Sequence, residues 1–359
     1  MDFTIDNEQK ALASAVRDMV GRRTPAQGEN GAGPRPHDAA LWRAMAETGL
    51  LGLPFAEDVG GFGASAVEVF VAARELGRAG VQTAYADALL ATSLLAAAGH
   101  DLVGAGVSGE ALVLPALAEP MRAFATVPGG VRAQVSGDEA ALDGFKGPVR
   151  FGADAAHFVV SAVSDEGTVL VLVDAAAAGP VGEAEVLGLE HAKGRILLRG
   201  ADADQALTDA VALGSVANAA AALGAMESAL TMTTDYLKTR KQFGVPLAAF
   251  QALTHRAAEM YVSVELARST AMFLAMSVAE GDTDPALVSR CRVVLGRTGR
   301  HVGQEAIQLH GGIAMTSEYA VGHLTAMLTA IERTYGDPRA HLGHLAAGVT
   351  DYSTVTVLT

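Results

Sequence analysis

The sequence predicts an α+β protein in three parts, with a helical domain at each end and a small β domain between them. Two observations carry this prediction. Apolar residues recur every three to four positions in both outer parts, and short β-branched or apolar runs bounded by turn residues fill the middle. We expect an N-terminal helical domain over residues 1–110, a barrel-like β domain over 111–204 and a C-terminal four-helix bundle over 205–359.

The N-terminal part reads as short helices separated by glycine-rich turns. Asp6 or Asn7 can cap the first helix, because both side chains can accept a hydrogen bond from a free backbone N–H of the first turn. A loop rich in Gly, Pro and Glu is expected at 24–37. The remaining predictions are a helix around Trp42, tight turns over 49–63, and helices at 68–76 and 82–97.

The middle part changes to strand-like patterning. Four short runs rich in β-branched or apolar residues predict strands at 111–117, 157–163, 168–173 and 195–198. Asp143-Gly144 is a favoured two-residue hairpin sequence, so we expect a turn there.

The C-terminal part predicts long helices at 206–239, 248–280 and 285–309, and a final helical segment at 317–348. Gly244 and Pro246 break the pattern between the first two helices. Pro285 suits the first turn of the third, and Gly311 with Gly312 can end it in a left-handed cap. Alanine and glycine along 212–225 indicate close helix packing.

Bulk properties narrow the classes of function. The net charge of −14 argues against nucleic acid or an anionic membrane as the main partner. The single cysteine, Cys291, excludes an internal disulfide. No basic segment followed by an apolar core opens the chain, and the apolar run 88–98 is too short to span a bilayer. We therefore expect a cytoplasmic protein, and its ten histidines form no metal-binding signature.

Two stretches in the C-terminal part point to chemistry. Alone, a basic residue near a helix end is commonly a solvated partner of the helix dipole. The first stretch contains Arg240, Phe243, Gly244, Phe250 and Gln251, and the second contains Gln308, Gly311, Gly312, Thr316 and Glu318. Together the stretches resemble the acyl-CoA dehydrogenase family, which carries R-x-x-F-G…F-Q and then Q-x-x-G-G-x-G-x-T-x-E, with Ala314 here in place of the third motif glycine. The resemblance extends to the stretch from Trp42 to Gly63, to 118–120 and to 142–146.

The resemblance implies a helical–β–helical fold that desaturates an acyl-CoA thioester with FAD bound across a subunit interface. By resemblance, Arg240 would neutralise the FAD pyrophosphate and Phe243 would pack on the dinucleotide. Gln251, Gln308 and the backbone at Leu309, Gly311 and Gly312 would hydrogen-bond its polar edges. The electron acceptor implied is an electron-transfer flavoprotein.

The flavin-ring side departs from the family pattern. Residues 121–125 and 148–150 replace the small-residue and W-I-T turns that contact the ring in the family. The family places its catalytic glutamate at a position that aligns with Tyr335, before Gly336, or at one near Gly214. Neither position is a carboxylate here. The nearest are Glu332, Asp337, Asp209 and Glu227, of which we expect Glu332 and Asp337 to be solvated surface charges.

This pattern resembles the small subunits of heterotetrameric bacterial acyl-CoA dehydrogenases that act on steroid side-chain or pimeloyl-type CoA esters. In those enzymes a large subunit carries the ring pocket and the base, while the small subunit supplies the FAD-arm site. Two alternatives stay open. One is a self-sufficient homotetrameric dehydrogenase with an atypical base such as Glu332 or Asp337. The other is a non-catalytic scaffold of the same fold.

Overall fold

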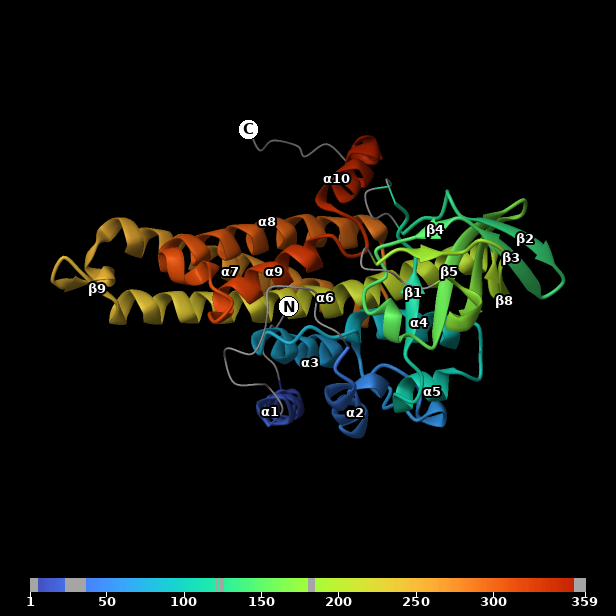
Figure 1. Ribbon diagram of the computed structural model, residues 1–359, viewed down its shortest axis with the longest axis horizontal. Helices are drawn as coiled ribbons and strands as arrows, with labels where there is room; N and C mark the ends of the chain where they lie inside the picture. The colour runs from blue at the N-terminus through green and yellow to red at the C-terminus, as the bar shows by residue number, and fades with distance from the viewer. Residues whose placement is uncertain (1–5, 23–36, 121, 123–125, 180–184, 352–359) are drawn as a thin grey trace, which may run out of the picture.

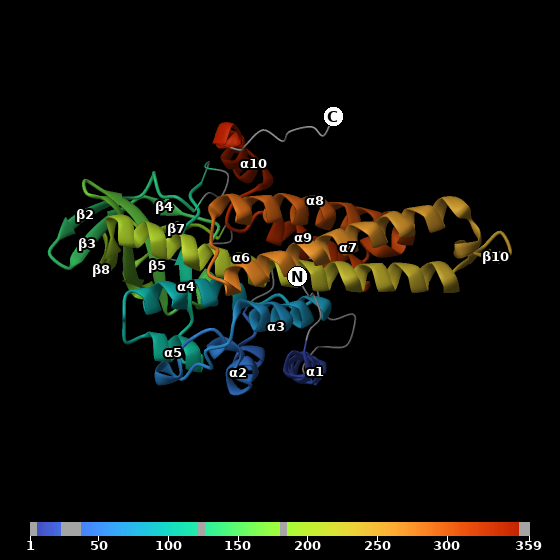
Figure 2. The same ribbon diagram turned by 180° about the vertical axis from the view of Figure 1, so that it is seen from behind.

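The computed structural model describes residues 6–22, 37–120, 122, 126–179 and 185–351. Figures 1 and 2 show long helices running side by side along the molecule, with the β domain at one end and a small hairpin at the other. The N-terminal helices cover one side of these long helices. Most of the predicted loop at 24–37 lies outside the described residues.

The N-terminal helices form where the capping signals predict. Asp6 caps the first helix, accepting a hydrogen bond from Gln9 N at 2.8 Å, while the Gln9 side chain accepts from Asp6 N at 3.0 Å. Short 3-10 turns occupy Leu50–Gly52 and Glu57–Val59 within the glycine-rich stretch. The helices are α1 (Asn7–Gly21), α2 (Ala39–Glu47), α3 (Ala66–Arg78), α4 (Tyr85–Ala97) and α5 (Val103–Ser108).

The middle strands form a barrel-like sheet. The order β1-β5-β2-β3-β8-β6 is closed by pairing between β5 and β6. Closure leaves few unpaired edges, which stabilises a small sheet. The strands are β1 (Val113–Ala116), β2 (Arg132–Ser136), β3 (Glu139–Asp143), β5 (His157–Ser164), β6 (Gly167–Asp174) and β8 (Ala192–Arg199), with a separate pair β4 (Phe145–Lys146) and β7 (Leu187–Gly188).

The predicted hairpin at Asp143-Gly144 is wrong. Asp143 is the last residue of β3 and pairs with Arg132, so the chain does not reverse there. The reversal between β2 and β3 lies at Gly137, whose φ of +60° suits a tight turn, and Ser136 pairs with Glu139 across it. Sequence patterning missed β2 and β3 because most of their side chains are exposed or half-buried and lack a clear apolar alternation.

The C-terminal domain is a bundle of long helices: α6 (Gly200–Thr239), α7 (Gln251–Ala279), α8 (Pro285–His310) and α9 (Ala320–Glu332), followed by α10 (Pro338–Ala347). Pro285 begins α8 as predicted. The segment 317–348 is not one helix, because Tyr335 (φ +57°) and Gly336 (φ +111°) interrupt it and Pro338 begins α10. This interruption brings Tyr335 into the interior of the molecule.

Glycine allows the N-terminal domain to approach the bundle closely. A Cβ at Gly77 of α3 would overlap the carbonyl of Ala221 on α6, and one at Gly224 would overlap the carbonyl of Arg74. The contact is reinforced by buried Glu227, which accepts from Arg74 Nη2 at 2.7 Å, from Arg268 Nη1 at 2.8 Å and from Arg78. By length and composition α6 and α7 could each span a membrane, but 72% of the α6 window is buried inside the protein.

Candidate functional site

The first predicted stretch forms a hairpin that projects from the end of the bundle (Figure 1). Strands β9 (Lys241–Gln242) and β10 (Val245–Pro246) pair around a two-residue turn made by Phe243 and Gly244. Both turn residues have positive φ, +51° and +83°, as a type I′ turn requires. Phenylalanine is strained in this region, and strain of this kind gathers at functional sites.

The strained turn presents an aromatic ring to solvent. Phe243 is 92% exposed, and its ring meets Phe250 edge-on at 6.3 Å between centroids. Arg240 ends α6, where its carbonyl accepts a hydrogen bond from Leu247 N at 2.8 Å. The side chains of Arg240 and Gln251 are exposed. The hairpin thus displays a guanidinium, a ring and an amide on one projecting element.

The second predicted stretch forms the end of α8. Gln308 is exposed, whereas Leu309 is 5% exposed and packs in the core. Gly311 has φ +68° and ψ −146°, a combination that only glycine adopts readily and that differs from the predicted left-handed cap. A Cβ at Gly311 or Gly312 would meet no heavy atom within 4 Å. The backbone of both glycines is therefore open to a ligand.

An aromatic cluster joins the two stretches. The ring of buried His310 lies 4.6 Å from that of Tyr236, which is one turn before Arg240, and 5.1 Å from that of Tyr319. Burial lowers the pKa of His310, which favours the neutral ring in this stack. The structure thus brings the ends of α6 and α8 together. None of the predicted arm residues lines either of the two cavities that border Tyr335.

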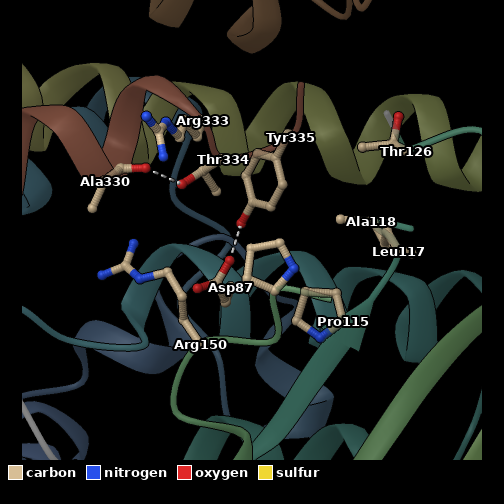
Figure 3. Close-up of a pocket in the computed structure, with 11 residues that line it drawn as sticks. Asp87, Pro115, Leu117, Ala118, Thr126, Arg150, Ala330, Arg333, Thr334 and Tyr335 are labelled. Carbon is tan, nitrogen blue, oxygen red and sulfur yellow. Dashed lines mark hydrogen bonds between the residues drawn. The ribbon is translucent and has the colours of Figure 1, made fainter. Parts of the chain in front are cut away.

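The flavin-ring side contains a small cavity of about 60 Å³ beside Tyr335 (Figure 3). The Tyr335 hydroxyl donates a hydrogen bond of 2.6 Å to Oδ1 of Asp87 on α4, as the dashed line in Figure 3 shows. Arg150 and Arg333 also line this cavity. Burial raises the pKa of Tyr335 well above its usual value, which keeps the phenol neutral and able to donate.

The two positions at which the family carries its base face one another in this chain. A Cβ added to Gly214 would lie 2.8 Å from Cε2 of Tyr335 and 3.2 Å from Cδ1 of Leu90. The Tyr335 ring therefore occupies the space in front of Gly214 on α6. No carboxylate stands at either position, as the sequence already indicated, so the family's proton acceptor is missing from both.

The carboxylates closest in sequence to those positions have structural partners. Asp209 accepts hydrogen bonds from Gln205 and from Thr283, the latter at 2.7 Å. The expectation that Glu332 and Asp337 are solvated surface charges is wrong for Glu332, whereas Asp337 is half-exposed. Glu332 accepts from Arg300 Nη2 at 2.6 Å with its side chain 9% exposed. Asp337 caps α10 by accepting from Ala340 N at 2.8 Å. These carboxylates are therefore engaged by structural partners and are not free to act as a base in the cavity beside Tyr335.

Sequence reasoning missed Asp87, the carboxylate that does line the cavity. Burial raises the pKa of Asp87, while Arg150 and the Tyr335 hydrogen bond oppose that increase. A signal was present in the sequence, because Asp87 is the only charged residue of α4, which is otherwise mostly apolar and buried. The signal is weak, because an acid in the first turn of a helix is also stabilised by the helix dipole without an interior partner.

The two short β-domain motifs prove to be structural. Nζ of fully buried Lys146 donates to Glu119 Oε1 at 2.8 Å and to Ser161 Oγ at 3.1 Å. Glu119 also accepts from the backbone N–H groups of Gly129, Gly130 and Val131. Burial alone would raise the pKa of Glu119, but the hydrogen bond and charge of Lys146 and the N–H groups of Gly129 and Val131 outweigh it and lower the pKa to about 2. Of the replaced turn at 121–125, residues 121 and 123–125 lie outside the described residues.

Comparison with protein families gives two matches. The N-terminal domain of acyl-CoA dehydrogenases matches residues 6–103, and the C-terminal domain of the same enzymes matches residues 205–349.

Individual proteins agree with these matches. Acyl-CoA dehydrogenase FadE27 of Mycobacterium tuberculosis is 29% identical over 95% of this chain and 100% of its own length. IpdE2 of the same organism, also an acyl-CoA dehydrogenase, is 29% identical over 88% of this chain and 89% of its own. The ChsE4–ChsE5 complex of that organism contains a chain with a TM-score of 0.87 and 26% identity, covering 99% of this chain and 100% of that one.

Proposed function

Because this chain belongs to the acyl-CoA dehydrogenase family, whose members are FAD-dependent oxidoreductases, we propose that it acts as one subunit of a heteromeric dehydrogenase. In this proposal it supplies the site for the FAD pyrophosphate and adenosine arm, and a partner subunit carries the base. The observation that carries the proposal is the contact between Tyr335 and Gly214, which fills the place of the base in this chain.

The arm-side residues fit a dinucleotide. The exposed Arg240 guanidinium suits bidentate contact with a phosphate, and the exposed Phe243 ring suits packing on a flat group. The amides of Gln251 and Gln308 and the open backbone at Gly311 and Gly312 offer further hydrogen bonds. These groups face solvent rather than a closed pocket, as expected of a site that a second chain completes.

In the family's reaction, FAD would supply the hydride acceptor for the β-carbon of an acyl-CoA, and a carboxylate would be needed to remove the α-proton. In this chain the residues at the two base positions have other roles. The Tyr335 hydroxyl is bonded to Asp87, and Gly214 has no side chain. We therefore assign this chain the role of binding and orienting the cofactor arm, and the partner the role of moving the proton.

The similar proteins favour a two-subunit assembly. One similar structure is a complex of two named proteins, ChsE4 and ChsE5, and another is a variant of the Tcur3481–Tcur3483 steroid ACAD, 28% identical with a TM-score of 0.84. We propose by analogy a heterotetramer with a large acyl-CoA dehydrogenase subunit and a steroid-type or similar bulky acyl-CoA substrate. An electron-transfer flavoprotein is the proposed acceptor.

The two alternatives fit the geometry less well. A self-sufficient enzyme needs a free carboxylate, and Glu332 and Asp337 are both engaged in structural bonds. A scaffold without flavin would have no need for an exposed phenylalanine in a strained turn. Among the described residues, Asp87 is a further candidate base for a self-sufficient enzyme, since it lines the small cavity beside Tyr335.

The decisive test is the flavin content of the chain purified alone and after co-expression with a large subunit of the same family from the same genome. We expect a colourless lone chain and a yellow complex with one FAD per pair of subunits. In the complex, Arg240→Ala should lower flavin occupancy because the phosphates lose their guanidinium partner.

The matched control is Arg297→Ala, which removes another exposed arginine from the middle of α8. This variant should retain full occupancy. A lone chain that is yellow and is reduced by an acyl-CoA would overturn the proposal in favour of a self-sufficient enzyme. Colourless complexes with every candidate large subunit would favour a scaffold.

A further inference from the structure

His310 is a buried residue at the centre of the predicted arm site, and the proposed function gives it no role. It is 4% exposed, whereas Gln308 before it and Gly311 and Gly312 after it lie on the surface. The arm groups of the hairpin are exposed as well. Exposed groups have little packing of their own, so the spacing between the hairpin and the end of α8 depends on the buried residues beneath them.

The His310 ring is fixed at the end of α8. Its Nδ1 lies 2.8 Å from the carbonyl oxygen of Ala306. Because a carbonyl can only accept, Nδ1 carries the proton and donates it. This bond runs back one turn along α8 and sets the direction of the ring. The imidazole therefore keeps a fixed place relative to α8 and to Gly311, which follows it.

Tyr236 connects this ring to the hairpin. The centroids of the Tyr236 and His310 rings are 4.6 Å apart with 32° between the ring planes, a favourable distance for an aromatic pair. The carbonyl of Tyr236 accepts a hydrogen bond from Arg240 N at 2.8 Å, and the carbonyl of Arg240 accepts one from Leu247 N at 2.8 Å. A continuous path of contacts thus leads from His310 to the base of the hairpin.

Tyr319 contacts the same ring from the residue before α9. Its centroid is 5.1 Å from that of His310, with 56° between the planes. Between these two residues lies the 3-10 turn η6 (Gly311–Met315). The turn continues in backbone bonds from Thr316 N to the Ile313 carbonyl at 3.1 Å and from Tyr319 N to the Thr316 carbonyl at 3.3 Å. The chain therefore leaves the aromatic cluster at His310 and returns to it at Tyr319.

We propose that His310 is a positioning residue for the FAD arm: stacked with Tyr236 and Tyr319, it holds the hairpin and η6 at the spacing that one dinucleotide needs. This role rests on the proposed function, and His310 performs it from beneath the exposed groups. Groups that are held at a set spacing bind one ligand more tightly than the same groups when they move independently, because less freedom is lost on binding. Removing the imidazole should therefore weaken FAD binding while every exposed arm group is retained.

A distance measurement between two spin labels on the full chain tests the positioning without flavin. The labels are attached at Gln242→Cys in β9 and Met315→Cys in η6, both exposed positions, in a Cys291→Ala background that leaves no other cysteine. We expect a narrow distance distribution, and one about twofold broader after His310→Ala, because the ends of α6 and α8 lose a buried contact. His310→Phe keeps a ring in the cluster and should restore the narrow distribution.

The second measurement is the affinity of the two-subunit complex for FAD, by titration of the flavin-depleted complex. His310→Ala should raise the Kd about tenfold, and His310→Phe should return it to within about threefold of the unmodified value. The matched control is His301→Ala, which removes a half-buried histidine from the same helix, where its Nδ1 lies 2.9 Å from Ser263 Oγ of α7. This control should change neither the distances nor the Kd.

The inference fails if a folded His310→Ala chain, verified by circular dichroism, keeps the narrow distribution or the full affinity for FAD. Equal effects of His301→Ala would also overturn it, since loss of any histidine of α8 would then loosen the bundle. If His310→Ala does not fold, Tyr319→Leu, which removes a half-buried partner ring, decides by the same two measurements. A complex that binds no flavin would overturn the proposed function and this role with it, whereas unchanged distances in a complex that binds FAD would overturn this role alone.

Discussion

The hydroxyl of Tyr335 donates a 2.6 Å hydrogen bond to Asp87, joining the loop between α9 and α10 to a helix 248 residues earlier in the chain. The bond links the N-terminal domain to the end of the bundle. It also leaves Asp87 as the carboxylate of the small cavity, at the place where a self-sufficient enzyme would need a base.

Replacing Asp87 tests whether its side chain has only a structural role or acts as the general base. We expect Asp87→Asn to leave turnover of the two-subunit complex within about twofold, because the amide oxygen still accepts from Tyr335 and the partner carries the base. Loss of a general base lowers turnover by about 10² or more. Steady-state kinetics of the complex with an acyl-CoA, with Glu332→Gln as a parallel variant, gives the measurement. A large loss in Asp87→Asn alone would assign the base to this chain.

The strained turn at Phe243 predicts a conflict between stability and cofactor binding. Phe243→Asn creates Asn-Gly, the favoured sequence for this turn, and should stabilise the lone chain by up to about 1 kcal/mol. The same change removes the exposed ring and should lower FAD retention by the complex. Thermal unfolding of the lone chain and flavin absorbance of the complex give the two readouts. A loss of both properties would show that the ring supports the fold instead.

The buried pair of Glu119 and Lys146 should dominate the stability of the β domain. Glu119→Gln would leave the Lys146 ammonium buried without its counter-charge, at a cost of about 3–5 kcal/mol. The double variant Glu119→Gln with Lys146→Met removes both charges and should recover much of that loss. Urea unfolding measures the free energy of unfolding of the single and the double variant. Equal stability of the single and double variants would mean that the pair is not coupled.

The same pair predicts loss of stability in acid. The pKa of Glu119 is lowered from 4.5 to about 2 in the folded chain, so folding favours the ionised form. Its contribution is therefore fully present above about pH 4.5 and is lost as the pH falls towards 2. The urea midpoint of the unmodified chain should fall across this interval more steeply than that of the double variant. If the urea midpoints of the two proteins fall in parallel as the pH is lowered, the loss of stability does not come from Glu119.

Helix periodicity and short β-branched runs are local signals, so the order of helical, β and helical parts could be predicted from the sequence, whereas the FAD-arm role of the residues near Arg240 stays a prediction. The sequence did not place the hairpin turn of β2 and β3, since Asp143 is held in a strand by pairing with Arg132. The break at Tyr335 had local signals in Gly336 and Pro338, which the apolar pattern of the flanking helices outweighed. The meeting of Tyr335 with Gly214 depends on tertiary packing and has no local signature.

That meeting predicts that the cost of adding a side chain at Gly214 depends on whether the Tyr335 ring is present. In the unmodified chain, Gly214→Ala places a Cβ 2.8 Å from the Tyr335 ring and should destabilise the protein by about 1–3 kcal/mol. In a Tyr335→Ala background the obstructing ring is gone. There only the contact with Leu90 Cδ1 at 3.2 Å remains, so the same substitution should be at least about 1 kcal/mol less destabilising, helped by the preference for alanine over glycine inside a helix such as α6.

Urea unfolding of the four proteins in this double-mutant cycle measures the coupling directly. The control is Gly343→Ala in α10, where a Cβ would meet nothing within 4 Å, so its effect should be the same in both backgrounds. If Gly214→Ala has equal effects with and without Tyr335, the ring does not fill the space in front of α6. The main support for placing the base in a partner subunit would then be lost.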